Sequence, residues 1–334
     1  MDVSGWLLRF AAGAPHVFVV EVPGGAAVRW AVEDLVLVRG WVPALSPADA
    51  DLVVLAGPGD SVPAEAVELV WGQVPAPRVR VVVDDPGAVP DVLSDAVARL
   101  AIGGEALSGA QQGTGDQHDD HGTDHDDHGT DHGGGHGGGH EHHGGVVAGL
   151  AMAERAPDRD GLALDRLHVV LGPVLVDWPA GLVLELALQG DVVQEAAARR
   201  DAAPPVPDVD PRVVLLDALA RLLAVAGWPD AVLRARRLRA AVLAGVVDDA
   251  RLRRFTRRVR RSRSLRWLTS GIGEIGGGDV TARWVAWLDE IDGHRTAPRH
   301  ARALDALPDL VRGHELGAVR LIVASLGPDL DREP

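Results

Sequence analysis

One segment with almost no apolar side chains divides this chain into two parts. Residues 116–145 hold nine of the fourteen histidines, together with eight carboxylates and many glycines. Such a segment cannot bury enough hydrophobic surface to offset the entropy lost on ordering, so we expect it to be disordered. The chain has 334 residues, of which 46% are hydrophobic, which is enough for about two cores. We therefore predict a folded domain over residues 1–110, a linker over 111–148 and a second domain over 149–334.

The first part of the chain alternates segments typical of strands and helices. Valine-rich apolar runs cover residues 16–22, 51–56 and 78–83. A segment with apolar residues at helical spacing follows each run, over 26–37, up to about 73, and over 89–100. A regular succession of strand and helix favours a parallel sheet. The fold class predicted for residues 1–110 is therefore α/β, with a small doubly wound parallel sheet.

The loops after these strands are the places where such a sheet binds ligands. Gly57 and Gly59 could hold a phosphate group, and Asp84 and Asp85 could bind a cation. Tight turns and solvated acidic side chains are more frequent than such sites, so we favour these simpler interpretations.

The second part predicts an α+β arrangement. Strands are expected over 167–171 and 181–188, with a hairpin turn at 189–191, a short strand over 192–195 and a polar surface connection over 152–160. A proline-rich connector at 201–210 separates this sheet, within 149–200, from helices expected over 211–226, 229–243, 251–268, 280–291 and 315–325. We predict a small antiparallel sheet followed by a helical bundle within residues 211–330.

Missing residue types exclude several chemistries. The chain has no cysteine, no tyrosine and no lysine. Without cysteine there can be no disulfide, zinc–thiolate site or cysteine-ligated iron–sulfur cluster. Without lysine there can be no Schiff base and no Walker-type phosphate loop.

The charge is distributed unevenly along the chain. Residues 1–110 hold 6 Arg and 14 acids (−8), residues 111–150 hold no Arg and 8 acids (−8), and residues 151–334 hold 27 Arg and 26 acids (+1). This acidity argues against a nucleic-acid partner. The N-terminus lacks the pattern of a signal peptide, and no uncharged apolar run is long enough for a membrane span. We expect a cytoplasmic protein, with a peripheral position at the inner face of the membrane as an alternative.

Two segments of the first part carry a family resemblance. PADADLVVLAG at residues 47–57 and VELVWGQVPAPRVRVVV at residues 67–83 resemble the cluster-bearing small subunit of complex I, and they are similar to the small subunit of nickel–iron hydrogenases. The resemblance covers about residues 15–100 and implies the same fold. In that family four cysteines hold a [4Fe–4S] cluster, whereas here residues 23–25 and Asp84–Asp85 lie near the expected ligand positions. The resemblance therefore implies the fold without the electron transfer.

The second part resembles a neighbouring subunit. The spacing from Gly172-Pro173 to Gln189-Gly190 is similar to the N-terminal sheet of the complex I quinone-site subunit, which is related to the hydrogenase large subunit. In that family a glutamine and histidines follow the Gly-Pro pair, but here Val174, Leu175 and Val176 follow it. The quinone-binding tyrosine and the nickel-binding cysteines are also missing. This resemblance implies a large-subunit-like domain without quinone or nickel ligands.

The densest charge run is rich in arginine. Thirteen arginines lie between Arg234 and Arg266, nine of them from Arg251 to Arg266. Such a run indicates either docking to an anionic membrane, RNA or an acidic partner, or a solvated helix face with ion pairs inside the protein. We favour the solvated face slightly, and contact with a membrane surface through Arg251 to Arg266 stays the alternative.

The histidine-rich segment is the one clear set of metal ligands in the sequence. Its candidate ligands are His118, His121, His125, His128, His132, His136, His140, His142 and His143. Neutral imidazoles at high local concentration bind borderline divalent metals, and the interleaved carboxylates attract cations. We expect no tightly bound cofactor, with Ni²⁺ or Zn²⁺ as the candidate ions, against the alternative of a low-complexity linker grown by repeat slippage.

The two resemblances occur in the order small subunit, then large subunit. They predict a fused relative of NADH-quinone oxidoreductase or hydrogenase subunits that has lost its cofactor ligands. We expect a non-catalytic accessory, structural or assembly component, without activity on its own, whose partners are protein subunits of a redox complex. The alternatives are a nickel or zinc storage or delivery protein, and an oxidoreductase subunit that uses its partners' cofactors.

Overall fold

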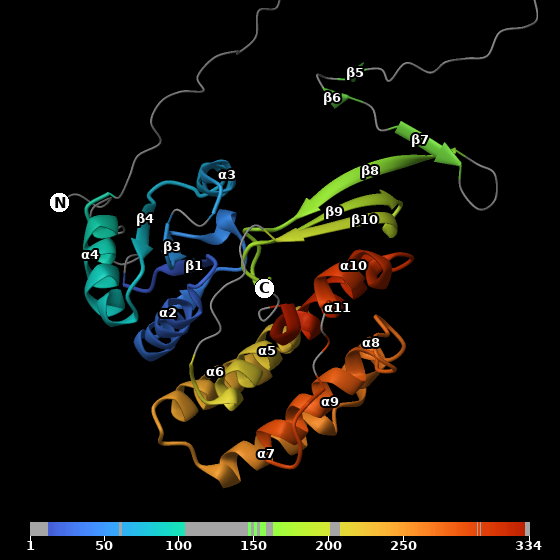
Figure 1. Ribbon diagram of the computed structural model, residues 1–334. Helices are drawn as coiled ribbons and strands as arrows, with labels where there is room; N and C mark the ends of the chain where they lie inside the picture. The colour runs from blue at the N-terminus through green and yellow to red at the C-terminus, as the bar shows by residue number, and fades with distance from the viewer. Residues whose placement is uncertain are drawn as a thin grey trace, which may run out of the picture.

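The computed structural model describes two folded parts of the chain (Figure 1). The described residues are 13–59, 62–103, 146–147, 150–151, 154–157, 163–200, 208–298, 300 and 302–330. The nine candidate metal ligands of the histidine-rich segment lie outside them. Two described residues of the predicted linker, Val146–Val147, form strand β5, which pairs antiparallel with β6 (Leu150–Ala151).

The N-terminal part is built on a parallel sheet of four strands. These are β1 (His16–Glu21), β2 (Val42–Pro43), β3 (Leu52–Ala56) and β4 (Val79–Val83), in the order β2-β1-β3-β4. The α-helices among its described residues are α2 (Ala26–Arg39), α3 (Ala64–Gly72) and α4 (Val89–Ala101). The predicted parallel α/β sheet is confirmed. The sequence did not predict β2, because two residues are too few to show a period.

Helices cover both faces of this sheet. Alternate residues of β1 point to opposite sides, so Val17 packs in one core with α2 and α4, and Phe18 packs in another core with α3. Strand β3 is buried on both faces over its whole length. This burial explains why it reads as an unbroken apolar run.

Close backbone packing accounts for the glycines at the carboxyl ends of the strands. A Cβ atom on Gly25 would lie 1.7 Å from the Ala56 oxygen, and one on Gly57, whose φ is +114°, would lie 2.7 Å from the Gly25 Cα. In the third loop, Asp85 accepts a hydrogen bond of 2.9 Å from the Gly87 amide. These contacts favour the interpretation of the loops as tight turns.

The C-terminal part begins with an antiparallel sheet. Its strands are β7 (Glu154–Pro157), β8 (Ala163–Leu171), β9 (Leu182–Gln189) and β10 (Val192–Arg200), in the order β10-β9-β8-β7. The predicted hairpin is confirmed. Three details were wrong: β8 begins four residues before the predicted start at 167, β10 extends five residues beyond the predicted end at 195, and β7 lies in the predicted surface connection. Pairing with a neighbouring strand decides the conformation of these segments.

Seven helices follow in the described residues. They are α5 (Pro211–Val225), α6 (Pro229–Leu243), α7 (Asp249–Arg260), α8 (Arg263–Thr269), α9 (Val280–Ile291), α10 (Ala303–Val311) and α11 (Leu316–Leu330). The single helix predicted over 251–268 is wrong, because Ser262 starts a new helix by accepting a hydrogen bond from the Leu265 amide. Helix α10 was not predicted, since Pro308 lies inside it and interrupts the helical pattern.

We expect Gly25→Ala to destabilise the N-terminal domain by more than about 2 kcal/mol, because the new methyl group would collide with the backbone of β3. The matched control is Gly72→Ala in α3, where a Cβ atom meets nothing within 4 Å. The control should change the free energy of unfolding by less than about 1 kcal/mol. Denaturant unfolding measures both, and equal effects would contradict this account of the turn.

Candidate functional site

A cluster of buried charges joins the two parts of the molecule. We call it the junction network, and it consists of Glu21, Arg29, Glu33, Asp34, Asp177, Asp217, Arg221, Arg236 and Arg239. Glu21 ends β1, the next three residues lie on α2, and Asp177 lies in the loop between β8 and β9. Asp217 and Arg221 lie on α5, and the last two arginines lie on α6.

Arg29 is the centre of the junction network. Its Nε donates to Glu21 Oε2 at 2.7 Å, its Nη1 to Glu33 Oε1 at 2.8 Å and its Nη2 to Asp217 Oδ2 at 2.5 Å. One planar guanidinium thus binds carboxylates from β1, α2 and α5, a geometry that a lysine could not provide. The contact with Asp217 crosses from the N-terminal to the C-terminal part.

Two arginines of the C-terminal part, Arg239 and Arg221, contact carboxylates of the N-terminal part. The Nη1 of Arg239 donates to Glu33 at 2.7 Å and to Asp217 at 2.8 Å, and its Nη2 donates to Asp34 at 3.1 Å. The side chain of Arg239 has no exposed surface. Arg221 donates to Glu21 through Nη2 and to the Trp178 carbonyl through Nη1. Hydrogen bonds or ion pairs therefore connect every element of the junction to another element.

Apolar side chains from each part pack against a hydrophobic core of the other part. Trp30 of α2, 2% exposed, belongs to the hydrophobic core of the C-terminal part. In return, Val174 and Val176 pack against the core between the parallel sheet and α3. The charges are consequently removed from water by packing on both sides.

The arginines keep the central carboxylates ionised. Burial raises the pKa of Glu33, but the guanidiniums of Arg236, Arg29 and Arg239 outweigh it and lower that pKa to about 2. Burial also opposes ionisation of Asp217, yet Arg29, Arg221 and Arg239 hold its pKa far below the ordinary value. Both groups therefore stay charged over the physiological pH range.

Asp177 differs from these two carboxylates. Burial raises its pKa, and Arg236, whose Nη2 lies 3.6 Å from Asp177 Oδ1, compensates only in part. Its backbone has φ +57°, in the left-handed region that few residues other than glycine adopt. A buried carboxyl with a raised pKa on a strained backbone is a frequent feature of functional sites.

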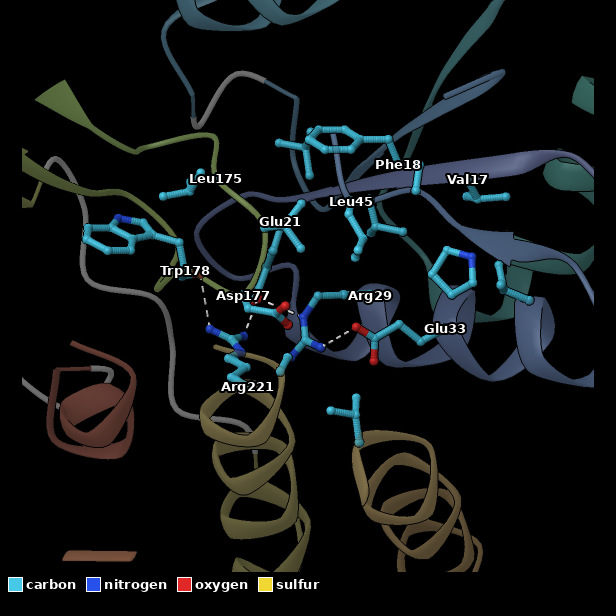
Figure 2. Close-up of a pocket in the computed structure, with 18 of the residues that line it drawn as sticks. Val17, Phe18, Glu21, Arg29, Glu33, Leu45, Leu175, Asp177, Trp178 and Arg221 are labelled. Atoms are coloured by element: carbon cyan, nitrogen blue, oxygen red, sulfur yellow. Dashed lines mark hydrogen bonds and ion pairs between the residues drawn. The ribbon is translucent and has the colours of Figure 1, made fainter. Parts of the chain in front are cut away.

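Asp177 borders a cavity of about 470 Å³ between the two parts of the chain. Figure 2 shows Arg29, Glu33 and Asp177 gathered together, with the apolar side chains of Phe18 and Leu175 on the walls. The cavity exists because β2 pairs with only His16 and Val17 of β1. Beyond that point the edge of β1 is open, and the 173–178 loop and α6 face it across the cavity.

The lining limits what this site can do chemically. It consists of alkyl and aromatic side chains with carboxylates and guanidiniums, and none of the described histidines, serines and threonines is part of it. Its size lies within the range of small-molecule pockets. The arrangement suits binding of a largely apolar molecule with one polar group near Asp177 and Arg236.

Pro173 and residues 174–176, which the sequence analysis compared with the quinone-site subunit, line this cavity, whereas Asp84, Asp85 and His168 do not. Asp84 and Asp85 are exposed at the end of β4, and His168 is exposed on β8. Within the described residues, no group of three or more His, Asp or Glu side chains is placed to hold a metal ion. No described helix is long and apolar enough to span a membrane.

Sequence reasoning missed the junction network, although a signal was present. Arg29 and Glu33, and likewise Asp217 and Arg221, are opposite charges four residues apart within otherwise apolar helices. Such pairs on a buried stripe indicate an internal ion pair. The favoured interpretation of the arginine run was a solvated helix face with ion pairs inside the protein. For Arg239 the ion pairs are present, but solvation was wrong because α6 turns this side chain into the junction.

Comparison of the chain with protein-family models, curated proteins and solved structures gives no match.

We expect Asp217→Asn to cost about 3–5 kcal/mol of unfolding free energy, because Arg29, Arg221 and Arg239 would keep their burial and lose a shared carboxylate. The control is Asp230→Asn on α6, whose 54% exposed side chain pairs with Arg234 and Arg258. That change should cost less than about 1 kcal/mol. Similar losses in denaturant unfolding would show that the junction network adds little.

Asp177→Asn should stabilise the protein at pH 7 by about 1 kcal/mol, because it removes a desolvated charge and asparagine tolerates the left-handed backbone. The raised pKa of Asp177 means that the folded protein prefers this carboxyl in its protonated form. That preference stabilises the fold in acid and is lost as the pH rises through the folded-state pKa. The difference between variant and wild type should therefore vanish below about pH 4. Thermal unfolding at several pH values measures it, and a variant less stable at pH 7 would contradict the assignment.

Proposed function

We propose that the chain is a non-catalytic accessory or assembly component of a complex I-like or hydrogenase-like redox complex. The observation that carries the proposal is the junction network, which holds a parallel-sheet domain and a sheet-and-helix domain together in one chain. The order of these domains agrees with the resemblance of the sequence to a small and a large redox subunit. We also propose that the N-terminal domain has a doubly wound fold and that the C-terminal helices form a bundle.

The chemistry of the junction also supports a structural role. The carboxylates at its centre are held ionised by arginines, so they are poor proton donors and acceptors at neutral pH. The chain has no cysteine to ligate a cluster and no tyrosine. Any reaction would then depend on the cofactors of partner subunits, in an NADH-quinone oxidoreductase-like or hydrogenase-like complex.

The experiment is complementation of a deletion strain in the native host. Loss of the gene should reduce the amount of assembled redox complex on native gels stained for NADH or hydrogen oxidation. The wild type and Asp230→Asn should restore it, whereas Asp217→Asn should not, because it breaks the junction. Redox subunits should copurify with the tagged full chain. Unchanged complex levels in the deletion strain, with no copurifying redox subunit, would exclude this function.

A second proposal is nickel or zinc storage or delivery, favoured by the nine histidines between His118 and His143. Removing residues 116–145 should abolish binding of several Zn²⁺ or Ni²⁺ ions in equilibrium dialysis and leave thermal unfolding unchanged. Binding by the intact chain should weaken as the pH falls through about 6.5, since protonated imidazole cannot ligate. A variant with the nine histidines changed to glutamine separates ligation from attraction by the carboxylates, and binding that survives it would contradict imidazole ligation.

A further inference from the structure

The arginine run predicted from the sequence splits into two sets in the structure. Arg236 and Arg239 turn inward to the junction network, and Arg258 and Arg260 pair with Asp230 and Asp289. Most of the other arginines of the run are exposed, and the described part of the chain offers them no carboxylate within ion-pair distance. Six of these lie together between the start of α7 and the start of α8, and we call them the basic face: Arg251, Arg253, Arg254, Arg257, Arg261 and Arg263.

Helix geometry places these charges together. Leu252, Phe255 and Val259 are buried and form the inner stripe of α7, which packs against α6 and α9. The arginines occupy the remaining surface of α7 and continue onto α8. Both helices lie in the part of the helical region that is remote from the parallel sheet (Figure 1). Like charges repel one another in the free protein, and an anionic partner bound to this surface would relieve that repulsion.

An exposed tryptophan accompanies the basic face. Trp267 of α8 is 83% exposed, and the next residue, Leu268, is 39% exposed. Arg263 and Trp267 are four residues apart, so they share one side of α8. Tryptophan is mostly buried in folded proteins, but it is enriched at the level of lipid headgroups, where its ring is apolar and its N–H is polar.

We propose that α7 and α8 dock the protein on anionic phospholipid headgroups, with the basic face against the phosphates and Trp267 at the interface. Arginine binds phosphate in a bidentate manner, and clusters of basic residues beside an apolar anchor are typical of peripheral membrane attachment. Although the whole chain has a net charge of −15, its acidity lies mainly before residue 151, and residues 151–334, which include α7 and α8, hold 27 Arg and 26 acids. Nucleic acid is disfavoured because a single exposed aromatic ring gives little base stacking. This proposal does not depend on membership in a redox complex.

The test is cosedimentation of the full chain with vesicles, in the presence of EDTA so that the histidines cannot bridge through metal. Vesicles of phosphatidylcholine and phosphatidylglycerol in equal amounts should bind the protein, and binding should fall with salt. Vesicles of phosphatidylcholine alone should bind much more weakly. Changing Arg253, Arg254 and Arg257 together to glutamine should lower the partition coefficient about 100-fold, at roughly fivefold for each charge.

The matched control changes three exposed arginines elsewhere, Arg39, Arg199 and Arg312, to glutamine, so that the net charge changes equally. It should bind like the wild type. Trp267→Ala should lower binding at least several-fold without changing the circular dichroism. Equal losses for both triple variants, or equal binding to both kinds of vesicle, would overturn the proposal. Binding to polyglutamate that survives Trp267→Ala, with no binding to vesicles, would point to an acidic protein instead and also overturn it.

Discussion

The contact between Arg29 and Asp217 is the interaction on which the arrangement of the whole molecule depends. It joins residues 188 positions apart, and both side chains are removed from water. A buried guanidinium is tolerated only if carboxylates meet it with good geometry, because desolvating a charge is expensive. Arg29 and Arg239 find those carboxylates only when α2, α5 and α6 lie together. The network therefore favours one relative position of the two domains.

The same constraint shapes the candidate site. Arg221 holds the Trp178 carbonyl, and Arg236 lies near Asp177, so the loop between β8 and β9 is anchored by the network. This loop forms one wall of the cavity, and the open edge of β1 forms another. The cavity is therefore a product of the docking of the domains. At its border, Asp177 keeps a raised pKa because the neighbouring arginines do not fully offset its burial.

Arginine serves two different purposes in a chain without lysine. At the junction, its planar group with several donors satisfies up to three carboxylates at once, as Arg29 does. On the basic face of α7 and α8, the same side chain is exposed and pairs with no carboxylate of the described residues, which leaves its charge available to a partner. Sequence spacing alone did not separate these uses, because Arg236 and Arg239 belong to the same basic run as Arg253 and Arg257.

The sequence by itself determined the local structure wherever the apolar pattern was long and regular. The apolar patterns predict strands β1, β3, β4 and β9, the second half of β8, and helices α2, α4, α5, α6 and α9. The tertiary structure alone decided the rest. Strand β2 and the polar part of β10 depend on pairing with a neighbour, and the partners of Arg29 and Arg239 depend on contacts far along the chain. The sequence shows that a charged side chain must interact with some polar partner. Only the fold decides whether that partner is water, a carboxylate of the protein or another molecule.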